Sequence, residues 1–455
     1  MTAGPELIVR ARRVVTPDGI IAADVAISGG LITAVTRLDD EAGAGGPADQ
    51  LELAADEVLL PGLVDTHVHV TEPGRTDWEG FATATLAAAA GGVTTIIDMP
   101  LNSIPPTVDA GRLEVKRESA RGQCSVDTGF WGGAVPGNAA DLAGLDEAGV
   151  FGFKAFMTDS GVPEFPPLDD DGLAAAMLQV AELDSLLVVH AEDESRLGRA
   201  AARPGRGYAG FLRSRPAAAE IAAVIRVIRL ATATRARAHV LHLSSADPVP
   251  LLAAAQTYGL PVSAETCPHY LTLAAEQIGD GRTEFKCCPP IRELANRERL
   301  WAALASGVIS CVVSDHSPCP PGLKCQSTGD FGAAWGGISS VQLGLPVTWT
   351  HARERGFALT DVARWMSANP AGLAGLSGKG AIAAGYDADL VAFAPDERFT
   401  VDPGQLLTRH TLTPYAGQEL SGVVRRTWLR GTEIWPGRPA VPAGRLLSAR
   451  NGGRT

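Results

Sequence analysis

Two histidines two residues apart, His67 and His69, give the first indication of chemistry in this sequence. They follow an apolar run over residues 58–64, which is short enough to be a buried strand. Because residues two apart in a strand point to the same side, both imidazoles can converge beyond the end of that strand. Two convergent neutral imidazoles suit a divalent transition metal. Such a pair could equally be two unrelated loop residues, so a metal site requires further ligands elsewhere in the chain.

Further candidate ligands lie at or near the ends of later apolar runs. They are Asp98, Lys154, His190, His242, Glu265 and Asp315. In a barrel of parallel strands the active site lies at the C-terminal ends of the strands, where most of these residues fall. Each one alone could be a core residue or a helix cap, and we expect His239, His269 and His316 to be structural or supporting residues. The ordered series as a whole favours a metal centre.

Lys154 is the unusual member of this series, because a lysine ammonium has no lone pair with which to bind a cation. It lies among Phe151, Phe153, Phe156 and Met157, where a charged amine needs a partner. A salt bridge is one solution. Carbamylation by CO₂ is another, because it converts the amine into an anionic carboxylate that can bridge two metals. The sequence leaves the choice between the two open.

The segments that would position these residues change in character along the chain. Residues 58–378 alternate between apolar strand candidates and Ala-rich helix candidates, which predicts a parallel sheet and most simply a (β/α)₈ barrel. A doubly wound open sheet is the alternative, but no Gly-rich phosphate-binding loop follows a first strand. Residues 1–57 and 379–455 instead contain short strand candidates separated by turns. We therefore expect both chain ends to form one small β-sandwich domain, with a surface loop at 37–50 and a frayed tail beyond Leu446.

The composition excludes several classes of function. The chain has 455 residues, of which 45% are hydrophobic and 20% charged, as is typical of a globular protein. A net charge of −12 without a run of Lys or Arg argues against binding nucleic acid or an anionic membrane surface. No segment has the roughly 18 apolar residues of a membrane span, and we expect no secretory signal. Seven cysteines without paired spacing favour reduced thiols and a cytoplasmic protein, and Cys319 with Cys325 lacks the second pair of a zinc knuckle.

Six segments carry a pattern that can be recognised. They are Gly62-Leu-Val-Asp-Thr-His-Val-His69, Gly152-Phe-Lys-Ala-Phe-Met157, His190-Ala-Glu-Asp193, His239-Val-Leu-His-Leu-Ser-Ser245, Glu265-Thr-Cys-Pro-His-Tyr270 and Ser314-Asp-His-Ser-Pro-Cys319. Together they resemble the amidohydrolase superfamily, and more narrowly its cyclic amidohydrolases: allantoinases, hydantoinases or dihydropyrimidinases, and dihydroorotases. The resemblance covers essentially the whole chain. It implies a (β/α)₈ barrel with a small β-sandwich and a binuclear metal centre.

The resemblance also implies the distribution of the ligands. The first metal would take His67, His69, Lys154 and Asp315, and the second would take Lys154, His190 and His242. Lys154 would be the carbamate, N6-carboxylysine, and a hydroxide would bridge the metals. The metals would be zinc, with iron, cobalt or manganese as the alternatives, because His, Asp and Lys ligands do not decide the metal. The family further implies a homotetramer.

Smaller features narrow the resemblance to the allantoinases. The similar segments are Glu72-Pro-Gly-Arg-Thr-Asp-Trp-Glu-Gly-Phe81, Asp98-Met-Pro-Leu-Asn-Ser103, Lys286-Cys-Cys-Pro-Pro-Ile-Arg292, Ser317-Pro-Cys-Pro-Pro321 and Ala334-Trp-Gly-Gly-Ile338. Thr71 stands where dihydroorotases usually carry an arginine for the substrate carboxylate. Residues 158–161 lack the tyrosine with which hydantoinases help to hold the oxyanion.

An allantoinase hydrolyses the cyclic amide of allantoin to allantoate in purine and ureide catabolism, so this is the activity that the resemblance implies. Asp315 would act as general base and then as general acid. Backbone groups near Cys288 and Gly337 and the Asn102 side chain would bind the small-molecule substrate. The alternatives are a hydantoinase or dihydropyrimidinase activity, a mononuclear deaminase of the same superfamily, and a non-catalytic scaffold related to dihydropyrimidinase. Lys154 argues against the deaminase, and the complete ligand series argues against the scaffold.

Overall fold

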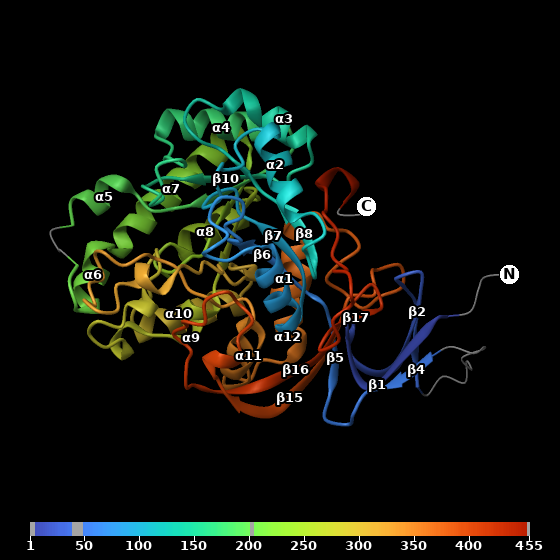
Figure 1. Cartoon of the computed structure of the whole chain (residues 1–455). Coiled ribbons are helices and arrows are strands. Elements are labelled where there is room, and N and C mark those ends of the chain that lie inside the picture. The colour runs from blue at the N-terminus through green and yellow to red at the C-terminus, as the bar shows by residue number, and fades with distance from the viewer. Residues whose placement is uncertain (1–4, 39–48, 201–203, 453–455) are drawn as a thin grey trace.

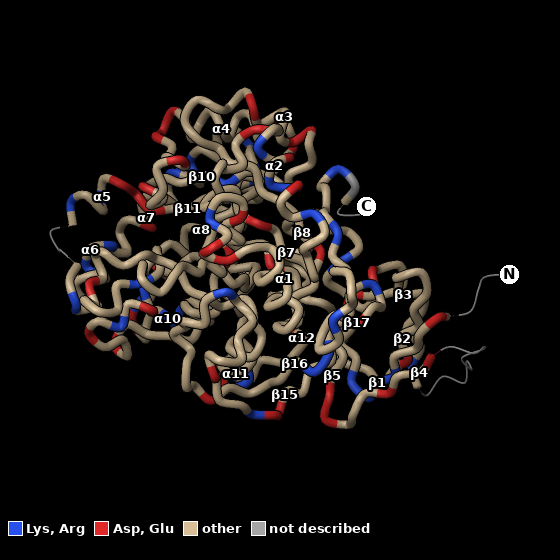
Figure 2. Tube along the Cα trace, in the orientation of Figure 1, with Lys and Arg blue, Asp and Glu red and all other residues tan. Residues whose placement is uncertain are grey.

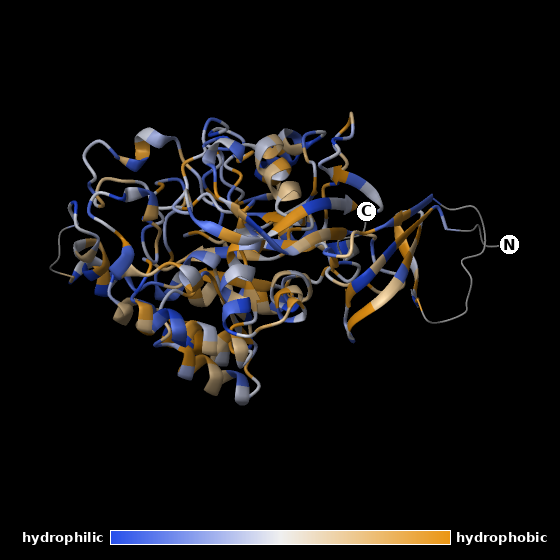
Figure 3. Cartoon of the chain, turned by 90° about the horizontal axis from the view of Figure 1, so that it is seen from below, coloured by the Kyte–Doolittle hydropathy of each residue, from blue (hydrophilic) through white to orange (hydrophobic). Residues whose placement is uncertain are grey.

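The structure, a computed structural model, describes residues 5–38, 49–200 and 204–452. Within these ranges the chain forms a large α/β part and a β-sheet that extends from one side of it (Figures 1 and 3). Lys and Arg are interspersed with Asp and Glu along the trace of both parts (Figure 2). Among the described residues, every helix is too short or too polar to cross a membrane.

The α/β part contains two parallel sheets. The smaller one has the order β6 (Leu63–Val68), β7 (Val93–Asp98) and β8 (Asp127–Phe130). The larger one has the order β9 (Gly132–Gly133), β10 (Phe153–Phe156), β11 (Leu186–His190), β12 (Arg237–Val240), β13 (Val262–Thr266) and β14 (Cys311–Val312). One residue separates β8 from β9, and a parallel bridge joins Val68, the last residue of β6, to His316 after β14. The C-terminal ends of consecutive strands therefore lie next to one another.

The α-helices of the described residues mostly follow these strands in the chain (Figure 1). They are α1 (Phe81–Ala90), α2 (Ala110–Ala120), α3 (Leu142–Glu147), α4 (Asp170–Glu182), α5 (Glu194–Gly198), α6 (Tyr208–Ser214), α7 (Ala217–Thr234), α8 (Val249–Thr257), α9 (Pro268–Thr272), α10 (Leu294–Ala305), α11 (Gly344–Glu354), α12 (Leu359–Ala363) and α13 (Asn369–Leu373). Asp109 and Asp169 begin α2 and α4, because their carboxylates accept hydrogen bonds from the first turn. Every residue of β7 and β11 is buried, as expected of parallel strands covered on both faces.

Strands from both chain ends form a third, mixed sheet. Its order is β17 (Thr432–Trp435), β16 (Glu419–Leu429), β15 (Leu390–Thr400), β5 (Val58–Pro61), β1 (Leu7–Thr16), β2 (Gly19–Ser28) and β3 (Leu31–Arg37), with β4 (Asp49–Glu52) paired to β1. Side chains from both ends, among them Val9, Val25, Leu390 and Trp428, share one apolar core. The loop predicted at 37–50 lies mostly outside the described residues.

The apolar run at 58–64 is two strands rather than the single one that we expected. β5 pairs with β1 and β15, whereas β6 pairs with β7. The break falls at Gly62, where a Cβ atom would lie 2.2 Å from Thr94 Oγ1. Only glycine allows the backbone to pass so close to β7. His67 therefore lies in β6 and His69 directly follows it, whereas β5 belongs to the sheet of the chain ends.

The prediction of a frayed tail beyond Leu446 is wrong for the residues that the structure describes. Leu447 is buried, and its N–H donates a hydrogen bond to the carbonyl oxygen of Thr128 in β8 over 2.9 Å. The sequence patterns also failed to indicate β8 and α2. The hydrogen bond to Thr128 explains why the tail was wrongly predicted to be frayed. Backbone pairing can fix a polar segment, and its composition does not reveal that pairing.

One buried ion network joins the two parts of the molecule. Lys379 Nζ lies 2.8 Å from Asp127 Oδ2 of β8, 2.7 Å from Asp389 Oδ2 and 3.0 Å from Asp387 Oδ2. Lys379, Asp127 and Asp389 are each at most 3% exposed at the side chain. Arg430 pairs with Asp127 as well. Because β8 belongs to the α/β part and Asp389 precedes β15, this network ties the sheet of the chain ends to the α/β part.

Candidate metal centre

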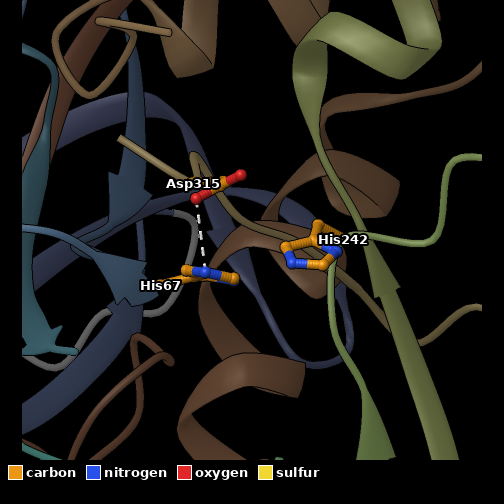
Figure 4. Close-up of side chains that lie close together, drawn as sticks. All are labelled: His67, His242 and Asp315. Atoms are coloured by element: carbon orange, nitrogen blue, oxygen red, sulfur yellow. Dashed lines mark ion pairs between the residues drawn. The ribbon is translucent and has the colours of Figure 1, made fainter. Parts of the chain in front are cut away.

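His67, His242 and Asp315 converge at the C-terminal ends of β6, β12 and β14 (Figure 4). One possible ligand atom from each lies within 4.8 Å of the other two. His67 Nε2 is 3.3 Å from Asp315 Oδ1, the contact marked by the dashed line in Figure 4. The three strands that carry these residues are far apart in sequence, so the convergence is a product of the fold.

His69 approaches the same oxygen atom. Its Nε2 lies 3.7 Å from Asp315 Oδ1, and its ring centroid lies 5.6 Å from that of His67. Both histidines of the His-x-His pair therefore face Asp315, as the two-residue alternation predicts. The side chains of His67 and His69 are at most 7% exposed.

His190 ends β11 and lies beside His242, with 4.6 Å between the ring centroids. Its Nε2 lies 2.8 Å from Glu192 Oε2, and Glu192 in turn pairs with Arg215. Because a carboxylate only accepts hydrogen bonds, this contact places the proton of His190 on Nε2. Nδ1 of His190 is then the nitrogen with a free lone pair.

Lys154 lies in β10 with its side chain completely buried, and it reaches the same space. Its Nζ lies 4.8 Å from the ring of Phe156. No hydrogen bond or ion pair joins Nζ to any residue that the structure describes, so the predicted alternative of a simple salt bridge is not what is seen. Burial lowers the pKa of Lys154, although the charge of Asp315 opposes this shift. Burial likewise raises the pKa of Asp315, and the charge of Lys154 opposes it.

The imidazoles of this cluster favour the neutral form, in which one ring nitrogen keeps a free lone pair. Burial, together with the neighbouring positive groups, holds the pKa of His67, His69 and His242 well below the usual range of histidine. His67 Nε2 and His242 Nδ1 are buried and have no hydrogen-bond partner among the described residues. Buried unpaired nitrogen atoms are costly unless something else binds them. Neutral imidazoles beside a carboxylate are a donor set that divalent transition metals accept, so the residues present fit such an ion.

A cavity of about 700 Å³ opens in front of this cluster. Its lining includes His69, Lys154, His190, His242 and Asp315, and also the three predicted substrate-binding residues Asn102, Cys288 and Gly337. A volume of this size holds a small molecule. The structure thus brings together the six ligand positions that the resemblance implies, of which all but His67 line the cavity.

Asn102 does more than line the cavity. It adopts a positive φ of 67°, and its amide Nδ2 lies 3.3 Å from His69 Nδ1. Asp98, another candidate of the sequence, lies outside the cluster: its carboxylate pairs with Lys116 Nζ at 2.6 Å and accepts the Val70 N–H at 2.8 Å. It therefore fixes the backbone after His69 and does not face the candidate metal centre.

Comparison with known proteins shows the family of this chain. The sequence matches the amidohydrolase family over residues 58–434. The chain belongs to the amidohydrolase family. Within this family it is 57% identical to an allantoinase of Streptomyces avermitilis, covering 97% of this chain and 98% of that protein. It is 47% identical to an allantoinase of Saccharomyces cerevisiae over 87% of each chain.

Solved structures of the same family have the same fold. L-hydantoinase (dihydropyrimidinase) from Arthrobacter aurescens superposes with a TM-score of 0.90 at 29% identity, covering 98% of this chain and all of that one. A dihydropyrimidinase from Brevibacillus agri gives a TM-score of 0.84 at 29% identity, over 97% of this chain and 98% of that one. The chain therefore has the amidohydrolase fold, and its sequence is more similar to allantoinases than to these hydantoinases.

Two residues that contact or line the candidate site were not predicted from the sequence. Glu192 contacts His190 and was visible only as part of a motif, while Arg215, which holds Glu192, lies in no motif. For Glu192, its position two residues after His190 was a signal that the sequence offered. Arg215 also lines the cavity, and only the fold brings it there.

Proposed function

We propose that this protein is an allantoinase, which hydrolyses the ring amide of allantoin to give allantoate in ureide catabolism. The observation that carries the proposal is the 57% identity to the Streptomyces avermitilis allantoinase over nearly the whole of both chains. The cavity beside the histidine cluster supports it, because it has room for a small cyclic amide.

The ligand set is part of the proposal. One divalent ion would be held by His67, His69, Lys154 and Asp315, and a second by Lys154, His190 and His242. Bound there, two ions supply Lewis acidity, which activates water near neutral pH and polarises the amide carbonyl. Zinc is the proposed metal, with iron, cobalt or manganese as alternatives.

Lys154 joins the two ligand sets only if its amine reacts. We propose that Nζ adds to CO₂, forming the carbamate N6-carboxylysine with loss of one proton to solvent. The support is geometric: the amine is buried, faces the cavity and has no partner among the described residues. A carbamate would also satisfy the polar group that is otherwise left without a hydrogen bond.

Asp315 is the side chain that we assign to proton transfer. It faces the cavity, and one of its oxygen atoms lies within 3.7 Å of both His67 Nε2 and His69 Nε2. In the proposed reaction Asp315 accepts the proton of the attacking water and then gives it to the ring nitrogen that leaves. The C–N bond of the ring breaks as that nitrogen is protonated, which yields the open chain of allantoate.

Substrate binding would fall to Asn102, Cys288 and Gly337. Gly337 has a φ of 148°, and a Cβ atom there would lie 2.2 Å from the carbonyl oxygen of Ser317. Any other residue would clash with Ser317, so glycine is required for the backbone to lie at the cavity wall. Backbone groups beside Cys288 and Gly337 would grip the polar edge of the ureide, together with the amide of Asn102.

The finer description of the architecture is also a proposal. We propose that the two parallel sheets close into one (β/α)₈ barrel within residues 58–378, because the sheets are linked at β8–β9 and at the Val68–His316 bridge. Residues 1–57 and 379–455, together with β5, would then form the flanking β-sandwich. The homotetramer and the cytoplasmic location stay predictions from the sequence.

A turnover panel tests the proposed activity. Purified protein is assayed with allantoin, hydantoin, dihydrouracil and dihydroorotate, and bound metal is measured on the same sample. Allantoin should be hydrolysed fastest, with two metal ions per chain. Faster hydrolysis of hydantoin or dihydrouracil would establish the second candidate, a hydantoinase. The similarity to solved hydantoinase and dihydropyrimidinase structures is the observation that favours this candidate. Absence of bound metal and of any turnover would instead support a scaffold.

A further inference from the structure

A buried carboxylate lies behind the metal-ligand cluster, on the side away from the cavity. Glu265 is the fourth residue of β13, and its side chain is 1% exposed. Its Oε1 lies 2.6 Å from His67 Nδ1, and its Oε2 lies 3.1 Å from His239 Nε2. Oε1 also accepts the backbone N–H of His242 over 3.3 Å. One side chain thus contacts three residues, one in β6 and two in or just after β12.

The contact with His67 decides which nitrogen of that ring can bind an ion. A carboxylate accepts hydrogen bonds, so Nδ1 of His67 carries the proton. Nε2 then holds the lone pair, and it is the atom that lies 3.3 Å from Asp315 Oδ1 without a hydrogen bond of its own. Glu265 therefore sets both the tautomer and the orientation of the imidazole.

The contact with His242 acts through the backbone. His242 has a φ of 37°, in the left-handed region that residues other than glycine seldom adopt. Its N–H is bound by the Glu265 carboxylate, and the next N–H, that of Leu243, donates to the Glu265 carbonyl oxygen over 2.8 Å. Two successive backbone groups are thus held by one residue. This clamp supports the unusual conformation that directs the His242 ring into the cluster.

Glu265 is itself fixed by its neighbours. His239 pairs with Ser263 in the register of β12 and β13, and its Nδ1 lies 2.6 Å from Ser263 Oγ. Ser263 and Glu265 are two residues apart in β13, so both side chains lie on the same side and meet the one imidazole. No Lys or Arg of the described residues pairs with Glu265, and its orientation therefore depends on histidine and backbone donors.

We propose that Glu265 is a positioning residue that couples the two metal positions, because it holds one ligand of each: His67 for the first ion and His242 for the second. The inference rests on the ligand sets given under the proposed function. Other supporting side chains reach a single ligand. Of the proposed ligands, Glu192 contacts His190 alone and Asn102 contacts His69 alone among the described residues. Loss of the Glu265 carboxylate should thus weaken both ions together, whereas loss of Glu192 should weaken one.

The experiment compares Glu265→Gln with two control variants. Glu192→Gln removes a carboxylate that supports one ligand, and Asp389→Asn removes a buried carboxylate far from the site. Each full-length protein is loaded with Zn²⁺ or Co²⁺ and titrated with a competing chelator, which gives the affinity of both positions without an activity assay. Thermal unfolding is followed for the metal-free and metal-loaded forms.

Glu265→Gln should lose about 10- to 100-fold in affinity at both positions, the usual effect of removing a carboxylate that supports a ligand. Glu192→Gln should show a loss at one position, and Asp389→Asn should lower thermal stability while binding both ions normally. A Glu265→Gln protein that binds both ions as tightly as wild type, or loses only one, overturns the inference. So does an equal drop in the unfolding temperature of its metal-free and metal-loaded forms without a change in affinity, since that is a purely structural role.

The wild-type measurement separates this inference from the proposed function. If the wild type binds two ions but does not hydrolyse allantoin, the activity is refuted and the role of Glu265 is still decided by the variants. If the wild type binds fewer than two ions, the ligand sets are refuted and the inference falls with them.

Discussion

The replacement Asp315→Asn separates the two roles proposed for this side chain. Asparagine keeps the shape and one carbonyl oxygen of the residue, but it cannot take up the proton of the attacking water. In the structure one Asp315 oxygen lies 3.3 Å from His67 Nε2 and 3.7 Å from His69 Nε2, so an oxygen in that place can still face the ion. General acid and base catalysis contributes roughly 10²- to 10⁴-fold. We therefore expect kcat to fall by about that factor, or about 3–5 kcal/mol of barrier.

The assay measures allantoate formation at saturating allantoin alongside the metal content of the same protein. Asp159→Asn is the matched control, because Asp159 lines the same cavity but is exposed and makes no contact with the histidines in the described structure. This control should keep turnover close to that of the wild type. Near-normal kcat for a fully metal-loaded Asp315→Asn protein would refute Asp315 as the proton carrier.

Three further changes test other parts of the structure. Lys154→Ala should lose bound metal and turnover, and added short carboxylic acids should restore part of both; full metal binding without added acid would contradict a bridging carbamate. Removal of metal from the wild type by a chelator should abolish turnover and lower the unfolding temperature, because ligand binding stabilises the folded state; re-addition of Zn²⁺, Fe²⁺, Co²⁺ or Mn²⁺ identifies the active metal. Lys379→Met should lower the free energy of unfolding, measured with denaturant, by about 3–5 kcal/mol, because Asp389 and Asp127 lose a buried partner. A decrease below about 1 kcal/mol, which is typical of a surface ion pair, would contradict this.

The ligand candidates could be predicted because each depends on a local pattern. His67 and His69 share a face by the alternation of a strand, and His190 stands where an apolar run ends. The same local logic placed Lys154 in a buried strand. The parallel α/β architecture followed from the alternation of strand and helix signals, as confirmed by the order of the sheets.

What the sequence could not provide depends on contacts between distant residues. Glu265 lies 198 positions after His67, and His239 looked like an ordinary core histidine until the register of β12 and β13 placed it against Glu265. The division of the run at 58–64 follows from the approach of Gly62 to Thr94, which no periodicity encodes. Such errors share one cause. A local pattern shows which chemistry a residue can perform, but its role depends on a partner that only the folded chain brings next to it.

The surroundings of Thr71 show how this applies to a position that the sequence comparison singled out. Thr71 is buried, and its hydroxyl donates to the carbonyl oxygens of Val70 and Arg75. The nearby guanidinium of Arg75 lies 2.5 Å from Glu164 Oε1 and also donates to the Asn102 carbonyl oxygen over 3.0 Å. Neither Thr71 nor Arg75 is one of the described residues that line the cavity. The Arg75 guanidinium is thus paired with Glu164 and with the backbone, so neither Arg75 nor Thr71 is placed to bind a substrate carboxylate.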